Sequence, residues 1–216
     1  MACLDSFKIE IIGKGGHGAK PNKSIDPVVI SASIIQDIQT LISRELSPVS
    51  PGVISICKIK GGTSYNIIPD KVILEGTARF INSSDRQRIS NRFKEFLNGV
   101  SSSRNVEIKF SYNYGYPPLI NNKKLTNSFK DIAKEIIEED IIELNSPTMV
   151  GEDMAYFLNE IPGVYFFLGG INKNKDGKAY SHHSSKFDVD ESVFWIGTSL
   201  LVKTVIDWLS NNEKVF

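Results

Sequence analysis

The sequence predicts an α+β protein in two parts, and three observations lead to that prediction. Over residues 5–115, stretches with strand-like and helix-like apolar spacing follow one another in the order β-α-β-β-α-β. This is the ferredoxin-like, split βαβ order, in which two helices cover one face of a sheet and the other face stays open. Two prolines in residues 114–119, YGYPPL, then interrupt the pattern, and residues 116–216 read as an α/β segment.

Each element of the first part is predicted from a local signal. Alternating apolar and polar residues predict strands, and apolar residues at helical spacing predict helices. The first helix is expected to start at Asp26-Pro27, an N-cap followed by a first-turn proline, and the second at a capping box of Ser84 and Gln87. In order, the predicted elements are a strand over residues 7–11, a helix over 28–42, strands over 53–60 and 72–80, a helix over 84–100 and a strand over 106–112.

The second part carries fewer signals. A helix is predicted over residues 125–136, a short helix over 154–159 and a closing helix over 191–210. Residues 163–170, GVYFFLGG, form a continuous apolar run, which is typical of a strand buried on both faces of an α/β sheet. So few strands in about 100 residues are thin material for an independent core, and we expect this part to be the less stable one.

Composition excludes several classes of function. The 25 Lys and Arg residues balance 25 Asp and Glu residues, so neither a nucleic acid nor an anionic membrane surface is indicated as a partner. The polar face of the third strand offers Glu75, Thr77 and Arg79 instead of exposed aromatic residues, which argues against an RNA-binding platform. The sequence has no run of about 18 apolar residues, so no membrane span is expected. Two widely separated cysteines and an N-terminus unlike a signal peptide fit a cytoplasmic protein.

Glycines surround the first of only three histidines. Gly13, Gly15 and Gly18 fit the register of a dinucleotide-binding loop, but Pro21 follows without an immediate helix. The Gly-Lys-Ser/Thr of a Walker loop is also missing from this stretch. Spacing alone therefore favours a plain turn at the end of a strand, with His17 as a bystander.

The other two histidines, His182 and His183, are adjacent in a loop and can be read as solvated residues. Zinc usually takes three or four protein ligands, and one of these histidines with Asp188, and with Glu152 or Asp153, does not make a complete local site. Adjacent residues in an extended backbone point to opposite sides, so both histidines are not expected to bind one ion.

Asn66 and Arg79 have equally plain readings when each is taken alone. Asn66 precedes IIPD, where an asparagine is common in a turn. Arg79 lies on the polar face of a strand, where a surface residue is the default.

Five motifs, taken together and in order, change this picture. They are MACLDSFKIEIIGKGGHGAKP, GGTSYNIIPDKVILEGTARF, MVGEDMAYFL, VYFFLGG and HSSKFDVDE. Their order strongly resembles the aminoacylase/carboxypeptidase family of zinc metallopeptidases, and most of all its amidohydrolase branch, with hippurate hydrolase, auxin-conjugate hydrolases and N-acetyl-diaminopimelate deacetylase. The resemblance covers almost all of the chain.

The resemblance implies a use for each part of the chain. In that family a catalytic domain with two metal ions is interrupted by a ferredoxin-like lid that also dimerises. Residues 5–115 would then be the lid and dimerisation domain, and residues 116–216 the C-terminal segment of the catalytic domain. HSSKFD is similar to the family's His-x-Pro-x-Phe/Tyr-Asp, which implies that His183 is a metal ligand. Ser185 stands where proline is usual, and His182 is the fallback.

The resemblance also implies roles for three residues of the lid. His17 would reach across the dimer and donate a hydrogen bond to the scissile carbonyl oxygen as it becomes an oxyanion. Its flanking glycines would let the backbone bend and keep bulk away from the ring. Asn66 and Arg79 would bind the substrate, Arg79 through its forked donors to a carboxylate. Glu152 and Asp153 match the family's Glu-Asp-Phe motif, with a methionine in place of the aromatic residue, and no chemical role is implied for them.

The family's remaining metal ligands and its general-base glutamate are expected to precede the part that this chain resembles. The chain is therefore expected to be the C-terminal part of a metal-dependent amidohydrolase that cleaves N-acyl amino acids or similar small substrates. The complete enzyme would hold two divalent ions (zinc, or manganese or cobalt), and this chain alone would bind metal weakly and be inactive.

Two kinds of partner follow from that expectation. The chain would form a homodimer through the lid, and a separate N-terminal half would be a further partner if the gene is truncated or split. The alternative is a non-catalytic dimerisation or binding remnant of such an enzyme. The presence of MVGEDM and HSSKFDVDE favours the hydrolase, because a lid module alone has no use for them.

Overall fold

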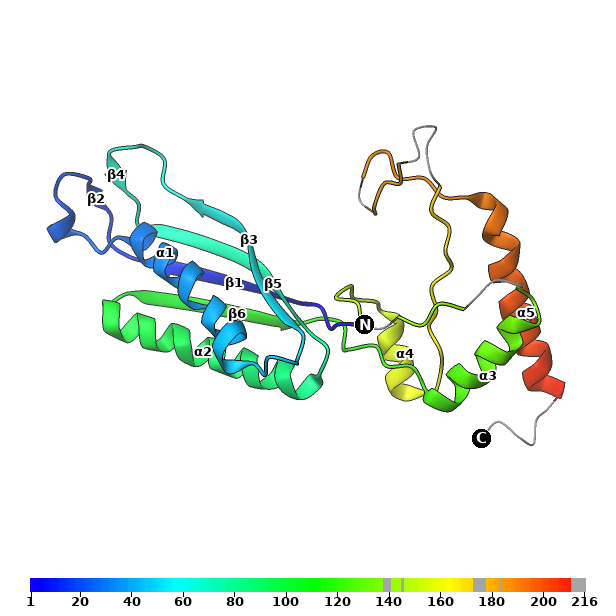
Figure 1. The fold of residues 1–216 in the computed structure, drawn as a ribbon. Helices are drawn as coiled ribbons and strands as arrows, with labels where there is room; N and C mark the ends of the chain where they lie inside the picture. The colour runs from blue at the N-terminus through cyan, green and yellow to red at the C-terminus, as the bar shows by residue number, and fades with distance from the viewer. Residues whose placement is uncertain (138–140, 145, 173–177, 183, 211–216) are drawn as a thin grey trace. The chain divides into compact units, whose positions relative to one another are not determined.

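The computed structural model describes residues 1–137, 141–144, 146–172, 178–182 and 184–210 (Figure 1). The chain divides into two compact units. Unit 1 comprises residues 1–120 and 146–156, and unit 2 comprises the described residues of 121–145 and 157–216. The predicted first part, residues 5–115, lies within unit 1.

Unit 1 contains a four-stranded antiparallel sheet and two long helices (Figure 1). In chain order these elements are β1 (Asp5–Ile12), α1 (Pro27–Asp37), β3 (Gly52–Gly61), β5 (Lys71–Phe80), α2 (Ser83–Arg104) and β6 (Glu107–Tyr114). The strands lie in the order β3-β5-β1-β6 across the sheet. Each strand and helix predicted between residues 7 and 112 coincides with one of these elements.

The first helix begins where its sequence signal predicts. The Asp26 carboxylate accepts hydrogen bonds from the backbone N–H groups of Val28 and Val29, at 2.8 and 3.4 Å, and Pro27 occupies the first turn. These contacts satisfy donors that a helix start otherwise leaves unpaired. A π-helical turn, Leu41–Glu45, extends this helical region past the predicted end at residue 42.

The predicted capping box of the second helix is wrong. Helix α2 starts one residue earlier than expected, with Asn82 as its N-cap, so Ser84 lies inside the first turn. Gln87 does not reach back to the helix start. Its amide instead donates hydrogen bonds to Asn91 Oδ1 at 3.3 Å and to the Tyr114 hydroxyl at 3.2 Å.

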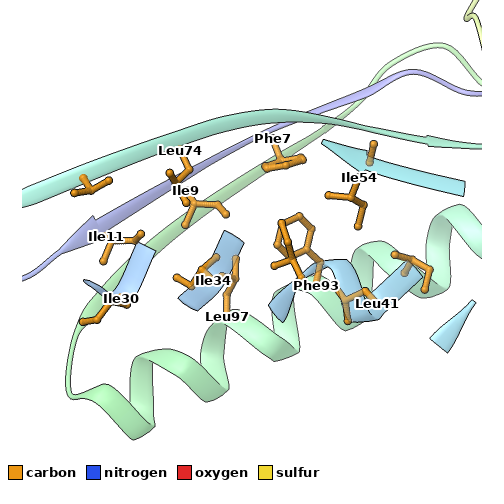
Figure 2. Close-up of a cluster of buried hydrophobic side chains, with 14 of the residues drawn as sticks. Phe7, Ile9, Ile11, Ile30, Ile34, Leu41, Ile54, Leu74, Phe93 and Leu97 are labelled. Atoms are coloured by element: carbon orange, nitrogen blue, oxygen red, sulfur yellow. The ribbon is translucent and has the colours of Figure 1, made fainter. Parts of the chain in front are cut away.

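One face of the sheet and the two helices enclose a single apolar core (Figure 2). Phe7 and Ile9 of β1 are buried there together with Phe93 and Leu97 of α2. The rings of Phe7 and Phe93 meet edge to face, with 5.0 Å between their centroids. Burial of each such side chain contributes roughly 1.5–3 kcal/mol, so the alternation that predicts the strands also fastens the sheet to its helices.

The opposite face of the sheet carries charged pairs instead of a second layer. Lys58 of β3 and Glu75 of β5 lie 2.8 Å apart across the strands, and Lys8 pairs with Glu10 on β1. These side chains are in contact with solvent, so the pairs keep the face soluble and add little to stability. Within the described residues of unit 1, both helices pack on the other face of the sheet.

Asp5 is a fully buried carboxylate that no sequence pattern singled out. It accepts hydrogen bonds from Arg86 Nε at 2.9 Å, from the Tyr112 hydroxyl at 2.8 Å and from the backbone N–H of Gly115 at 3.0 Å. A buried charge is tolerated only when it is paired and hydrogen-bonded in this way. The cluster ties the start of β1 to α2 and to the end of β6.

Beyond the sheet, the structure describes α3 (Lys123–Lys134), α4 (Met154–Glu160) and α5 (Phe194–Ser210), the last preceded by a 3-10 turn, Glu191–Val193. All three coincide with predicted helices. Asn122 caps α3, and its Oδ1 accepts a hydrogen bond from the backbone N–H of Leu125 at 3.1 Å.

The strand predicted over residues 163–170 is wrong, because this stretch is not a strand in the structure. A strand needs a backbone neighbour for its N–H and C=O groups. Here the side chain of Asn121 takes the neighbour's place: Nδ2 donates to Tyr165 O at 2.8 Å, and Oδ1 accepts from Tyr165 N at 2.9 Å. The apolar run alone therefore does not make this stretch a strand.

The helical stretch from Glu191 to Ser210 exposes an unusual amount of apolar surface. By length and composition it could cross a membrane, and only 6% of that stretch is buried. A helix that packs beneath a further layer of protein has the same composition, so the feature indicates a face that needs cover. The exposed side chains are Phe194, Trp195, Leu201, Val202, Val205, Ile206, Trp208 and Leu209.

Candidate functional site

His17 lies on a short two-stranded ribbon at one end of unit 1 (Figure 1). The ribbon pairs β2 (Gly16–His17) with β4 (Ile67–Ile68) in antiparallel register, with His17 opposite Ile67. One step further, the backbone N–H of Gly18 donates to Asn66 O at 2.9 Å. The ribbon therefore brings together two predicted site residues, His17 and Asn66, that lie far apart in the sequence.

The glycines around His17 allow the loop to pack closely against its neighbours. None of them has a positive φ; among the described glycines that conformation belongs to Gly62. A Cβ on Gly13 would lie 2.2 Å from Ile25 O, and one on Gly16 would lie 2.3 Å from Ser24 Oγ. Any side chain there would collide with these atoms, so glycine is required because the loop lies directly against its neighbours.

The His17 ring is exposed and oriented by its own loop. Its Nδ1 accepts a hydrogen bond from the backbone N–H of Ala19 at 3.1 Å. In a neutral imidazole one nitrogen accepts and the other carries the proton, so Nε2 is the N–H group of this ring. His17 thus presents a hydrogen-bond donor to whatever meets the ribbon.

Asn66 is exposed beside it. Its side-chain Oδ1 accepts a hydrogen bond from the Ser64 hydroxyl at 2.7 Å. Because the carbonyl oxygen of the amide is engaged, the NH2 group is the part oriented for donation. The ribbon therefore presents two donors, which suits a partner rich in acceptor oxygens.

Arg79 lies elsewhere, at the other end of β5. Its Nη1 donates to Met149 O at 3.3 Å, and the side chain is half-buried. The strand runs from Lys71, beside the ribbon, to Arg79, which at about 3.4 Å per residue separates the two places by about 27 Å. The structure of one chain does not bring Arg79 together with His17 and Asn66.

Two adjacent carboxylates, Glu152 and Asp153, follow the segment that Arg79 contacts. A Cβ on Gly151 would lie 3.6 Å from Arg79 Nη1, so the backbone just before Glu152 is next to the guanidinium. A hydrogen bond with Glu152, followed by partial desolvation and the charge of Glu152, raises the pKa of Asp153. The two acids behave as an interacting pair, which sequence spacing did not predict.

The predicted metal ligand, His183, lies outside the described residues. Its neighbour His182 stacks on Phe187, with 4.8 Å between ring centroids. Asp188 accepts a hydrogen bond from Asn172 Nδ2 at 2.9 Å. Within the described part of the chain, no three His, Cys, Asp or Glu side chains are grouped so that they could hold a metal ion. The described residues therefore do not by themselves fit a metal.

Known proteins resemble this chain along almost its whole length. The model of a family described as peptidase family M20/M25/M40 matches residues 7–207. N-acetyl-L-cysteine deacetylase from Bacillus subtilis is 33% identical over 214 residues, which cover 99% of this chain and 50% of the relative. Thermostable carboxypeptidase 2 from Saccharolobus solfataricus is 39% identical over 199 residues, 91% of this chain and 49% of the relative. N-acetyldiaminopimelate deacetylase from Leuconostoc mesenteroides is 37% identical over 204 residues, 94% of this chain and 51% of the relative.

Solved structures show the same relation. A protein from methicillin-resistant Staphylococcus aureus, to which an aminohydrolase activity has been ascribed, matches with a TM-score of 0.83 and 30% identity, over 96% of this chain and 53% of that one. The YXEP protein of Bacillus subtilis, described as a dinuclear metal binding peptidase, matches in fold with a TM-score of 0.74 at 23% identity, over 97% and 51%. The chain spans about half the length of the relatives it matches.

Proposed function

The chain belongs to peptidase family M20/M25/M40, and from this membership we propose that it forms part of a metal-dependent amidohydrolase. The names of its relatives support hydrolysis of amide bonds, since they include two N-acyl amino acid deacetylases and a carboxypeptidase. The proposed substrate is an N-acyl amino acid or a similarly small amide, taken from the cytoplasm.

The proposal rests on the hydrogen bond between Ala19 N–H and Nδ1 of His17. Hydrolysis of an amide develops negative charge on the carbonyl oxygen, and an N–H donor aimed at that oxygen stabilises the transition state. The Ala19 contact leaves the proton of the ring on Nε2, at the exposed end of the ribbon. We assign His17 this role, with Asn66 as a second donor to the substrate.

The position of Arg79 supports a homodimer. A planar guanidinium suits the carboxylate of an amino acid, but Arg79 lies about 27 Å along β5 from the ribbon. An N-acyl amino acid is about two residues long, roughly 7 Å when extended. His17 and Arg79 can therefore contact one substrate molecule only if they come from two copies of the chain.

We propose that residues 5–115 form a ferredoxin-like lid that dimerises, and that residues 116–216 are the C-terminal segment of the catalytic domain. The strand order β3-β5-β1-β6, with both helices packed against one face, supports the first assignment. Two chains joined through such lids would each offer a ribbon to the other.

We propose that the metal ions (two, of zinc, manganese or cobalt) are held mainly by residues on the half of the family length that this chain does not span. His183 would contribute one ligand. When bound, the ions would activate water for attack on the amide. The described residues of this chain would contribute donors and substrate contacts, and this chain alone would be inactive.

Metal content and hydrolysis, measured on the purified 216-residue chain, test this proposal. We expect less than stoichiometric metal and no hydrolysis of N-acetyl amino acids by the chain alone, and both to appear when the remaining half of the enzyme is supplied. Stoichiometric metal with metal-dependent turnover by the 216 residues alone would contradict the proposal that most metal ligands lie outside this chain. No turnover with the other half present would contradict the function.

The second candidate is a dimerisation or binding remnant without chemistry. Such a remnant would keep the lid and the ribbon. It would not need residues 149–156, the first of which, Met149, accepts a hydrogen bond from Arg79 through its backbone oxygen. Co-production with the remaining half separates the two candidates, because a remnant would neither associate with it nor restore hydrolysis.

A further inference from the structure

Asp70 lies between β4 and β5 and binds the chain at two points shortly before His17. Its backbone oxygen accepts a hydrogen bond from Gly13 N–H at 2.8 Å, and its side-chain Oδ1 accepts one from Gly15 N–H, also at 2.8 Å. The two glycines belong to the segment that connects β1 to the ribbon. One residue therefore fixes both ends of the three-residue stretch that leads to the ribbon.

The contact between Asp70 and Gly15 is close as well as directed. A Cβ on Gly15 would lie 2.9 Å from Asp70 Oδ1 and 2.7 Å from Ile68 O, so the carboxylate lies directly against the backbone of this glycine. One residue earlier, Lys14 exchanges two backbone hydrogen bonds with Ile25, each 2.9 Å long. All three N–H groups of the stretch are thus bonded, and that of Gly15 is the one that depends on a side chain.

The ribbon that carries His17 is short. It pairs two residues of β2 with two of β4, and an isolated two-stranded ribbon is only marginally stable in water. The position of the His17 ring therefore depends on how the chain beside the ribbon is anchored. Asp70 is exposed, and a hydrogen bond at the surface contributes little to the stability of the whole fold, so the effect of this contact is local to the ribbon.

We infer that Asp70 is a positioning residue, which acts through Gly15 to keep the Nε2 donor of His17 where the oxyanion develops. This inference rests on the proposed function. A donor to an oxyanion is effective only within a narrow range of positions, and a displacement of about 1 Å can cost on the order of 100-fold in rate. A carboxylate suits the task, because a charged acceptor binds an N–H group more strongly than a neutral one does.

The kinetic test uses the complete enzyme, that is, residues 1–216 together with the remaining half of the family length, with N-acetyl-methionine as the substrate. Asp70→Ala should lower kcat about tenfold and leave KM nearly unchanged, because the donor of His17 acts mainly on the transition state. Asp70→Asn should retain most of the activity, since its amide oxygen can still accept the hydrogen bond from Gly15 N–H.

Asp37→Ala is the matched control. Asp37 is the last residue of α1, is exposed like Asp70, and accepts a hydrogen bond from Ser33 Oγ at 3.0 Å. Its loss should change neither kcat nor KM.

A second readout does not depend on activity. At about pH 8 an ordinary imidazole is neutral, and the nitrogen-15 resonances of the His17 ring, identified by their loss in His17→Ala, show which nitrogen carries the proton. In the wild type and in Asp37→Ala the proton should lie on Nε2. In Asp70→Ala the resonances should shift towards a mixture of the two neutral forms, because the loop that contains His17 and Ala19 is no longer anchored.

Three results would overturn this inference while the proposed function stands. They are an unchanged kcat in Asp70→Ala, an equal loss of kcat in Asp70→Asn, and His17 resonances that Asp70→Ala leaves unchanged. A wild type that hydrolyses no N-acyl amino acid would overturn both the proposed function and this role of Asp70.

Discussion

At the scale of single residues, His17 and Arg79 illustrate how neighbours decide what a side chain can do. The Ala19 N–H engages Nδ1 of His17 and leaves Nε2 as the donor, which suits the role that we propose for this histidine. Arg79 has one donor on Met149 O, which steadies the guanidinium while its remaining donors can bind a carboxylate.

The two cysteines should differ in reactivity. Cys3 is buried, and burial, followed by the charge of Asp5, raises the pKa of its thiol. Cys57 is exposed. Because the thiolate is the reactive form, Ellman's reagent at pH 8 should label one thiol promptly and the second only after denaturation. Cys57→Ser should remove the prompt reaction; prompt labelling of both thiols in the native chain would contradict the buried position of Cys3.

The raised pKa of Cys3 also determines how the stability of the fold changes with pH. The folded state favours the neutral thiol, so this contribution is fully present below the pKa of an unfolded cysteine, about 8.5, and declines as the pH rises above it. Cys3→Ala should reduce the loss of stability between neutral and mildly alkaline pH.

At the scale of elements, the buried ion pair between Asp5 and Arg86 fixes how β1, α2 and β6 meet. Arg86 also donates to Gly115 O at 2.9 Å, so both partners hold the same residue after β6. Only the complete cluster is tolerable in the core, since either partner alone would be an uncompensated buried charge.

Removing one partner should therefore be costly. We expect Arg86→Ala to lower the free energy of unfolding by about 3–5 kcal/mol, because Asp5 remains buried without its cation. Arg92→Ala is the control on the same helix: Arg92 pairs with Glu45 at 2.8 Å but is only partly buried, and its loss should change stability little. Urea unfolding measures both, and equal effects would contradict the account of the cluster.

The elements of unit 1 follow from local signals, whereas the contacts between elements do not. Alternation predicts β1, and Asp26-Pro27 predicts the start of α1, because each signal acts within a few residues. The pairing of Asp5 with Arg86 joins residues 81 positions apart and leaves no local trace. Residues 163–170 fail as a strand for a similar reason, since pairing depends on a neighbour that an apolar run cannot specify.

The candidate site, too, could be predicted from the sequence only in part. From spacing alone, His17 and Asn66 were turn residues without a function and Arg79 was a surface residue. The order of the motifs is what singled them out. The ribbon then brought His17 and Asn66 together. That Ile67 faces His17 across β2 and β4 is a matter of strand register. That register was not readable from the sequence.

At the scale of the whole molecule, the chain carries one unit with a closed core and another with much exposed apolar surface. The core of unit 1 joins both helices to the sheet, whereas α5 leaves a long apolar face uncovered. The chain spans about half the length of its relatives, and we propose that the other half covers this face in the complete enzyme.

Limited proteolysis should cleave unit 2 before unit 1. We expect trypsin to cut the isolated chain first within residues 121–210 and to leave a resistant fragment that contains residues 5–115, because a packed core protects the backbone from cleavage. Identification of the fragments by mass spectrometry measures this. A resistant C-terminal fragment with the first unit degraded would contradict the assignment of stability.

We propose that His17 of one chain and Arg79 of another act on the same substrate molecule. The most direct test of this proposal is activity after mixing two variants of the complete enzyme, His17→Ala and Arg79→Ala, each nearly inactive alone. If the residues act across a dimer, each mixed dimer regains one intact site, so exchange of subunits should restore roughly a quarter of wild-type activity. Mixed dimers that form without regaining activity would contradict the claim.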